Sequence, residues 1–324
     1  MRVAVVGAGA LGRVYGVRLV AVGDQVAFVV RPERVAEAAP FAIEQVNGPK
    51  RRDVVERPRR VAEVPADTDI LLVAVRFDQL DQAGPGSLAE LLRGAPDRPV
   101  VLLTPSMPAQ KAALEQAIGR PILAAMPGVS GYIDERDVVR YWITAVATTL
   151  IEAPDPGAAP EHRAAVEQLA RRLTNADVPS RIERDVAAQN AATTTAFFPL
   201  IAAIDAGGGV DGVLSDKALL STAFEAAKEC DALARKLGKV APWANLLTRF
   251  VGPFTLKPGI ALARRLFPEA VRFVERHFGP KLHEQHLAMG ASILALGREH
   301  GVPLPALERL MRIVAARSAP PSGG

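Results

Sequence analysis

The sequence predicts an α/β domain followed by an all-helical one. Short apolar, β-branched runs alternate with helical patterns over the first half of the chain, and strand signals stop at about residue 183. The chain has 324 residues, too many for one ordinary domain and enough for two. We therefore expect a doubly wound sheet over residues 1–183, a helical domain over 184–316 and a disordered tail over 317–324.

The first thirty-one residues contain the most informative motif. Val3–Val6 is a buried-strand pattern, and the glycine motif Gly7–Gly12 (Gly-Ala-Gly-Ala-Leu-Gly) follows it without a gap. Apolar residues at helical spacing then run to Val22, and Val26–Val30 is a second strand pattern. Strand, glycine turn, helix and strand in this order predict a Rossmann dinucleotide-binding unit.

Each glycine of the motif has an expected role. Gly7 allows a tight turn, Gly9 lets a pyrophosphate approach the backbone, and Gly12 lets the helix pack against the strand. The phosphates would lie at the helix N-terminus, where free N–H groups attract anions. The alternative is a glycine-rich turn with no ligand. The expected cofactor-binding residues of this motif are Gly7, Ala8, Gly9, Ala10, Leu11 and Gly12.

The end of the second strand indicates which dinucleotide binds. An acidic residue there would hold the ribose 2′-hydroxyl of NAD, whereas arginine accommodates the 2′-phosphate of NADP. Arg31 occupies this position and Arg34 can add a second guanidinium, so we expect NADP(H). Glu33 argues mildly for NAD, and Arg31 as a merely solvated charge is the alternative.

Further patterns extend the α/β reading to about residue 183. An alternating segment at 41–46, the turn Asn47-Gly48 and residues 53–57 predict a hairpin. The other predicted strands are 70–75, 100–103, 122–125, 139–142 and 145–151, with helices at 88–93, 110–118 and 161–175. The predicted helices of the second half are 187–206, 221–237, 281–300 and 304–316, with short helical pieces interrupted by proline and glycine between residues 238 and 280.

Composition limits the class of protein. The chain is 49% hydrophobic and 23% charged, and its net charge of +4 suits an anionic cofactor without requiring nucleic acid. Cys230 is the single cysteine, which excludes an intrachain disulfide. The first strand leaves no room for a signal peptide, and no apolar run is long enough to span a membrane. We expect a cytoplasmic protein with a small-molecule substrate and no nucleic-acid or membrane partner. Whether the protein forms a homodimer is not decided by the sequence.

Several segments together resemble the ketopantoate reductase (2-dehydropantoate 2-reductase) family. The resemblance extends along nearly the whole chain. It implies a Rossmann domain, a helical domain and an NADPH-dependent oxidoreductase (dehydrogenase) that reduces a 2-oxo acid to a 2-hydroxy acid. The segments are Gly7–Gly12, Leu71–Gln79, Val101–Met107, Phe198–Ala202, His283-Glu284 with Gly290, and His300–Pro305.

The resemblance also assigns the site, with several replacements. Asn190 stands at the family's catalytic lysine, and Thr194 and Phe198 stand at two asparagines that follow it. On the cofactor side, Arg76 replaces a lysine and Pro105 an asparagine; Glu284 matches the substrate-side glutamate. No lysine occurs between Lys111 and Lys217, so a shifted register does not restore the missing one.

These replacements change the expected chemistry. Reduction of a carbonyl builds negative charge on oxygen, and the amide of Asn190 can donate a hydrogen bond there but no proton. Asn190, Thr194 and Phe198 share one face of their helix and make it less charged than a ketopantoate site. We expect an NADPH-dependent reductase of a 2-oxo acid or a less polar ketone or imine, with Asn190, Thr194 and Glu284 at the reacting group.

Two other functions remain open from the sequence. A catalytically degenerate NADP(H)-binding sensor or partner protein would keep the glycine motif without the chemistry. An authentic 2-dehydropantoate 2-reductase is the other. His283 and His286 could supply a replacement acid, because histidine titrates near neutral pH. We expect no metal, since His-Glu-x-His lacks the spacing of a zinc site.

Overall fold

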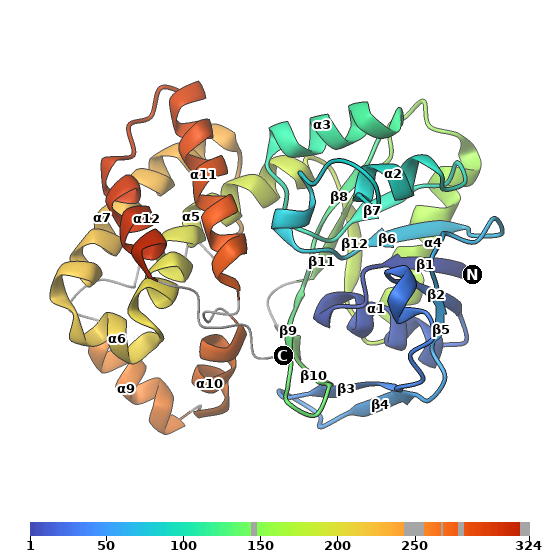
Figure 1. Cartoon of the computed structure of the whole chain (residues 1–324), viewed down its shortest axis with the longest axis horizontal. Coiled ribbons are helices and arrows are strands. Elements are labelled where there is room, and N and C mark those ends of the chain that lie inside the picture. The colour runs from blue at the N-terminus through green and yellow to red at the C-terminus, as the bar shows by residue number, and fades with distance from the viewer. Residues whose placement is uncertain (144–147, 243–255, 267, 278–281, 318–324) are drawn as a thin grey trace. The chain divides into compact units, whose positions relative to one another are not determined.

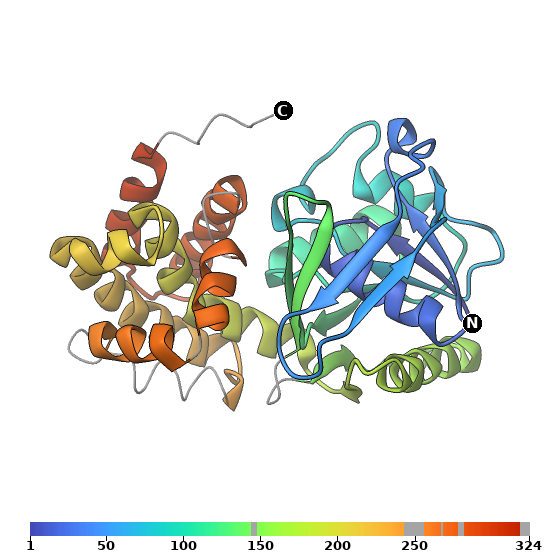
Figure 2. The ribbon, with the colours of Figure 1, turned by 90° about the horizontal axis from the view of Figure 1, so that it is seen from below.

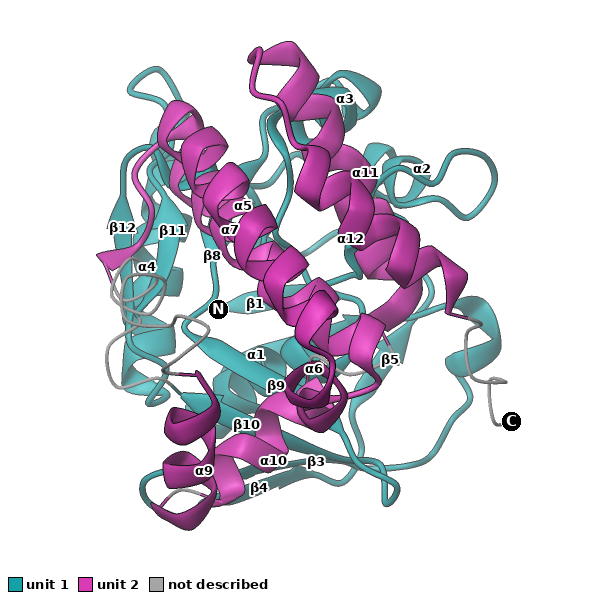
Figure 3. Ribbon diagram, turned by 90° about the vertical axis from the view of Figure 1, so that its left-hand side faces the viewer, with its two compact units in different colours: residues 1–187 teal, residues 188–324 magenta. Residues whose placement is uncertain are grey.

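The computed structural model describes residues 1–143, 148–242, 256–266, 268–277 and 282–317. The chain divides into two compact units, Met1–Ala187 and Ala188–Gly324, coloured separately in Figure 3. The domain boundary predicted from the sequence, between residues 183 and 184, stays a prediction. The predicted tail lies, apart from Arg317, outside the described residues.

Unit 1 contains an eight-stranded sheet in the order β12-β11-β8-β7-β6-β1-β2-β5 (Figure 1). Its pairs are parallel except β11 with β8, which is antiparallel. The sheet forms because its central strands are apolar runs buried on both faces. The strands are β1 Arg2–Val6, β2 Gln25–Val29, β5 Arg59–Val61, β6 Ile70–Val73, β7 Val100–Leu102, β8 Leu123–Met126, β11 Thr149–Glu152 and β12 Ser180–Glu183.

A second sheet of four strands, in the order β4-β3-β10-β9, also belongs to unit 1 (Figure 2). The predicted hairpin is found as β3 and β4, in which Phe41 pairs with Val55 and Gly48 adopts a φ of +66°. The separate sheet was not predicted, nor were β5, β9 and β12. The strand predicted at 145–151 is β11, which begins at Thr149; residues 144–147 lie outside the described part. The strands are β3 Phe41–Gln45, β4 Arg52–Val55, β9 Val129–Ile133 and β10 Val138–Ile143.

Helix α1 (Ala10–Ala21) packs against both sheets, because it contacts β1 and β2 as well as β3, β4, β9 and β10. It is therefore buried on all sides from Gly12 to Leu19, and even Arg18 has no exposed surface. Arg18 lies 3.3 Å from Asp53 of β4 and over the ring of Tyr141. The other helices of unit 1 are α2 Leu88–Arg93, α3 Pro108–Ile118 and α4 Pro160–Asn175.

Unit 2 is helical in its described residues, and the long predicted helices are all present (Figure 1). Helix α7 packs closely on α12, and α12 also contacts α11. Gly208 and Gly209, both with positive φ, follow the end of α5. In the described part of the chain no strand follows Glu183, as predicted. The helices are α5 Val186–Gly207, α6 Val210–Ser215, α7 Lys217–Leu237, α9 Leu256–Leu266, α10 Pro268–His277, α11 His283–Glu299 and α12 Pro305–Ala316.

Among the described residues, none of the helices is both long enough and apolar enough to cross a membrane. Cys230 lies buried in α7, and burial raises the pKa of its thiol far above the ordinary value. This cysteine is therefore a packing residue and not a reactive thiol.

Candidate functional site

The turn between β1 and α1 requires glycine at two of its three glycine positions. Gly7 has a φ of +96°, and a Cβ added there would lie 2.7 Å from the carbonyl oxygen of Ala74. A Cβ added to Gly12 would lie 1.9 Å from the carbonyl oxygen of Gly7. Neither contact is sterically acceptable, so the fold itself explains these two glycines.

Gly9 differs from its neighbours in the motif. Its φ of −77° and ψ of −168° are available to any residue, and an added Cβ would find no atom within 4 Å. Gly9 is also exposed. The fold therefore gives no reason for glycine at this position, whereas a ligand that must approach the backbone would give one.

The N-terminus of α1 is open to an anion. The first helical bond runs from the N–H of Arg13 to the carbonyl of Gly9 at 3.0 Å, so the N–H groups of residues 10–12 have no partner one turn earlier. No side chain caps this end, and its first turn contains no acidic residue. Free N–H groups and the helix dipole together favour a phosphate here.

Two further loops lie beside the glycine motif at the carboxyl ends of the central strands. The N–H of Ala74, after β6, donates to Val6 at 2.8 Å, and the hydroxyl of Thr104, after β7, donates to the carbonyl of Val75 at 2.5 Å. Both loops carry predicted cofactor-side residues. Arg76 is exposed and pairs with Asp78 at 2.7 Å, and Pro105 follows the buried Thr104.

The segment after β2 places its two predicted arginines differently. Arg31 is exposed, and within the described part of the chain its side chain makes no hydrogen bond or ion pair. Arg34 instead forms a two-pronged pair with Glu37, through Nε to Oε1 at 2.8 Å and Nη2 to Oε2 at 2.9 Å. Arg34 thus already has an acidic partner one turn away, which was not predicted.

Arg13 and Arg60 both pack on Phe41, and Arg60 also holds the segment that contains Arg34 and Glu37. Their guanidinium carbons lie 4.4 and 4.3 Å from the centroid of the Phe41 ring. Arg13 also donates to the Asp137 carboxylate at 2.9 Å, and Arg60 donates to the carbonyl oxygen of Glu37 at 2.6 Å. Neither role was predicted, and the only sign of it in the sequence is that each arginine stands next to apolar residues, Arg13 before Val14 and Arg60 before Val61.

The predicted substrate-side residues lie in unit 2. Asn190 and Phe198 of α5 are buried, Thr194 between them is half-buried, and Glu284 is exposed in the first turn of α11. Phe198, which stands where the family has its second asparagine, is fully buried. The catalytic roles of Asn190, Thr194 and Glu284 stay predictions.

A buried acid–imidazole cluster in unit 2 was not predicted as a unit. Oδ2 of Asp205, in α5, lies 3.0 Å from Nδ1 of His283 and 2.9 Å from Nδ1 of His286. A carboxylate only accepts, so both rings donate from Nδ1. Burial alone would raise the pKa of Asp205, but these hydrogen bonds outweigh it and hold that pKa below its ordinary value. His283 and His286 thus face Asp205 inside the unit, whereas Glu284 does not.

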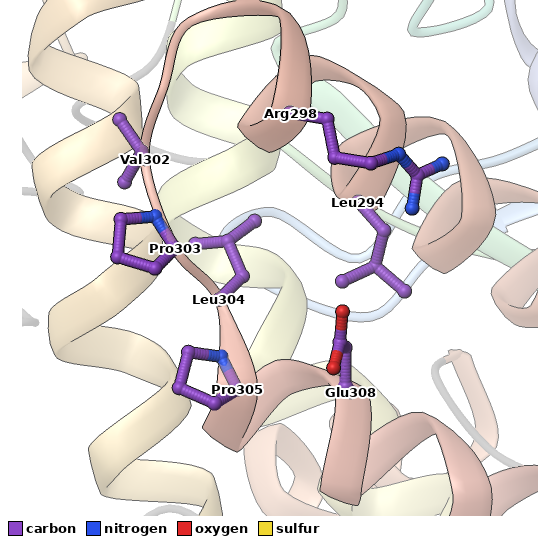
Figure 4. A pocket seen from close by; sticks show the side chains of 7 residues that line it. All are labelled: Leu294, Arg298, Val302, Pro303, Leu304, Pro305 and Glu308. Atoms are coloured by element: carbon purple, nitrogen blue, oxygen red, sulfur yellow. The ribbon is translucent and has the colours of Figure 1, made fainter.

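A pocket of about 240 Å³ lies between the end of α11 and the start of α12 (Figure 4). Its lining is mostly apolar, with the charged ends of Arg298 and Glu308 at one side. The N–H groups of Ala306 and Leu307, at the start of α12, are held by Glu229 at 2.9 and 3.1 Å. None of the predicted site residues lines this pocket, and we assign it no role. The lining residues are Leu294, Arg298, Val302, Pro303, Leu304, Pro305 and Glu308.

Comparison with known proteins gives the same family as the sequence motifs. Residues 3–141 match the family model described as ketopantoate reductase PanE/ApbA. No curated protein sequence matches the chain.

Solved structures match the chain over almost its full length. A 2-dehydropantoate 2-reductase from Geobacter metallireducens GS-15 is 18% identical with a TM-score of 0.68, over 98% of this chain and 99% of its own. A PanE/ApbA family ketopantoate reductase from Ralstonia eutropha JMP134 is 21% identical with a TM-score of 0.65, over 98% of both chains.

A further structure is a D-mandelate dehydrogenase with NADH and anilino(oxo)acetate. It is 15% identical with a TM-score of 0.63, over 98% of this chain and 97% of its own. At these identities the structures establish the fold, and the family model adds the sequence match. Residues 3–141 thus match the model of the ketopantoate reductase PanE/ApbA family, and the whole chain has the fold of ketopantoate reductases.

Proposed function

We propose that the protein is an NADP(H)-dependent reductase of the ketopantoate reductase type, acting on the carbonyl of a 2-oxo acid or of a less polar ketone or imine. One observation carries the cofactor part of this proposal. Gly9 lies exposed before the open N-terminus of α1, and the fold needs no glycine there. Arg31, with its free guanidinium after β2, supports the choice of the 2′-phosphate form.

The substrate part rests on the replacements in α5. By the family resemblance, Asn190, Thr194 and Phe198 occupy the positions of a lysine and two asparagines. An amide, a hydroxyl and a benzyl group make a less charged surface than a lysine with two amides. A D-mandelate dehydrogenase shares the fold, and mandelate carries a phenyl group in place of a polar chain. We therefore place aromatic and apolar 2-oxo acids ahead of ketopantoate.

The proposed roles follow from what each group can donate. The reduced nicotinamide would supply the hydride. The amide of Asn190 and the hydroxyl of Thr194 would donate hydrogen bonds to the carbonyl oxygen, where negative charge develops. Glu284, exposed in the first turn of α11, would orient a polar group of the substrate. None of the three delivers a proton as readily as a lysine, so a slow reductase is expected.

Two assays, one of nucleotide binding and one of turnover, test this function. NADPH and NADH are titrated directly into the protein, and oxidation of each is then followed with ketopantoate, phenylglyoxylate and a series of aliphatic ketones. We expect NADPH to bind more tightly and phenylglyoxylate to be reduced faster than ketopantoate. Tight nucleotide binding without turnover of any compound would contradict the reductase.

A second candidate, a nucleotide-binding protein without catalysis, is favoured by one specific observation. The position of the family's catalytic lysine reads Asn190, and no lysine occurs between Lys111 and Lys217. Such a protein would bind NADP(H) through unit 1 and turn over nothing. The substitution Asn190→Lys separates the two candidates, because it should raise ketopantoate reduction only if the rest of the site is competent.

A further inference from the structure

We propose that Glu37 sets the nucleotide preference of this protein by competing with the 2′-phosphate of NADP(H) for Arg34. This inference rests on the proposed function, because it needs a dinucleotide in unit 1. It assigns to Glu37 the role of weakening the preference for NADP(H) and of keeping NAD(H) acceptable.

The first support is the geometry of the Glu37–Arg34 pair. Both carboxylate oxygens of Glu37 accept from the guanidinium of Arg34, at 2.8 and 2.9 Å. A phosphate offers Arg34 the same two-pronged arrangement of acceptors. Glu37 therefore occupies the face of Arg34 that a 2′-phosphate would use.

The second support is the exposure of this pair. The side chains of Arg34 and Glu37 are each 40% exposed. Ion pairs this exposed are weak, so a dianionic phosphate can replace Glu37 on Arg34. The pair thus lowers the affinity for NADP(H) without abolishing it.

The third support is that the backbone at Glu37 is held in place, so its carboxylate stays near Arg34 when a phosphate displaces it. Arg60 holds the backbone of its segment, donating to the carbonyl oxygens of Glu37 at 2.6 Å and of Ala39 at 2.5 Å. Arg60 also lies over the ring of Phe41, and Arg13, the residue after the glycine motif, lies over the same ring. The segment is therefore tied to the N-terminal turn of α1.

The charge state of Glu37 agrees with this position. The hydrogen bonds from Arg34 outweigh the effect of desolvation and hold the pKa of Glu37 below its ordinary value, with smaller contributions from Arg60 and Arg13. Glu37 is thus ionised at neutral pH. A 2′-phosphate at Arg34 would meet this negative charge, whereas the uncharged 2′-hydroxyl of NAD(H) would not, and could donate to it.

The test compares the dissociation constants of NADPH and NADH for the full-length protein and four variants, measured by direct titration. The variants are Glu37→Gln, Arg34→Gln, the double variant, and Glu167→Gln as a control. Glu167 also forms an exposed pair with an arginine of unit 1, but that partner is Arg171, one turn along α4, and the strand that α4 chiefly contacts is β12, at the edge of the large sheet opposite β5.

We expect Glu37→Gln to tighten NADPH roughly threefold to tenfold and to change NADH by less than about twofold. Arg34→Gln should weaken NADPH, and more strongly in the Glu37→Gln background, while the control keeps the wild-type ratio. A ratio of NADH to NADPH dissociation constants that is unchanged or falls in Glu37→Gln would overturn the inference while leaving the proposed function in place. Failure of the wild-type protein to bind either nucleotide would overturn both.

Discussion

The substitution Gly9→Ala separates the demands of a ligand from those of the fold. The backbone angles at Gly9 suit alanine, and the added methyl would have no neighbour within 4 Å. Alanine also restricts the unfolded chain, which stabilises by about 0.4–1 kcal/mol, while the loss of glycine before a helix costs a similar amount. We expect the free energy of unfolding to change by less than about 0.5 kcal/mol.

Nucleotide binding should respond very differently. A methyl group at Gly9 occupies the space through which a pyrophosphate approaches the N-terminus of α1. We expect the dissociation constants of NADPH and NADH to rise at least about tenfold, which corresponds to about 1.4 kcal/mol. The measurements are urea unfolding and nucleotide titration of the same preparations.

Substitutions at two further glycines serve as controls for Gly9→Ala. Gly157→Ala places a methyl in open space at an ordinary φ, outside the motif; it should stabilise the fold by about 0.4–1 kcal/mol through the unfolded chain and leave nucleotide binding unchanged. Gly12→Ala drives its Cβ to 1.9 Å from the Gly7 carbonyl oxygen and should lower both stability and binding. If Gly9→Ala bound NADPH as the wild type does, the role given to the open turn would be refuted.

Three other substitutions test separate parts of the molecule. Arg31→Gln should weaken NADPH about tenfold and leave NADH unchanged, because only the 2′-phosphate needs the guanidinium; titration of both nucleotides checks this, and tighter binding of NADH to the wild type would contradict it. Asp205→Asn should lower stability at pH 7 by about 2 kcal/mol. Because the fold lowers the pKa of Asp205, the difference in unfolding free energy between the wild type and the variant should persist at every pH above the ordinary pKa of aspartate, near 4, and shrink at lower pH. Urea unfolding between pH 7 and pH 3 measures this difference, and a difference that stays constant over the whole range would contradict the prediction. Glu229→Ala should cost about 1 kcal/mol, because Glu229 holds the first N–H groups of α12, and an unchanged melting temperature would exclude that role.

The strands that could be predicted differ physically from those that could not. β1, β6 and β7 are apolar runs in the centre of a sheet, and a buried strand has few alternatives to such a composition. β5 and β12 lie at the two edges of the same sheet and contain Arg59-Arg60 and Ser180-Arg181, polar residues suited to an edge. Without an apolar pattern, only their pairing partners identify them as strands.

The same distinction applies to the candidate site. The glycine motif is local, so its turn could be derived from six consecutive residues. The pairing of Arg34 with Glu37 is also local, but its attachment to the turn of α1 depends on Arg60, which β5 brings beside β2. The cluster of Asp205 with two histidines joins α5 to α11, and no spacing rule connects residues so far apart in sequence.

The burial of α1 explains why binding and cofactor choice belong together in unit 1. A helix enclosed by two sheets should be apolar throughout, yet α1 contains Arg13 and Arg18 at full burial. The four-stranded sheet neutralises both, through Asp137 in the turn before β10 and Asp53 in β4. Arg13 also packs on the ring of Phe41. Arg60 packs on the same ring and donates a hydrogen bond to the backbone carbonyl of Glu37. The smaller sheet therefore connects the glycine turn, where we propose that the phosphates bind, to the segment that we propose reads the 2′ position. The proposed reaction depends instead on α5, where by the family resemblance Asn190 occupies the position of the lysine.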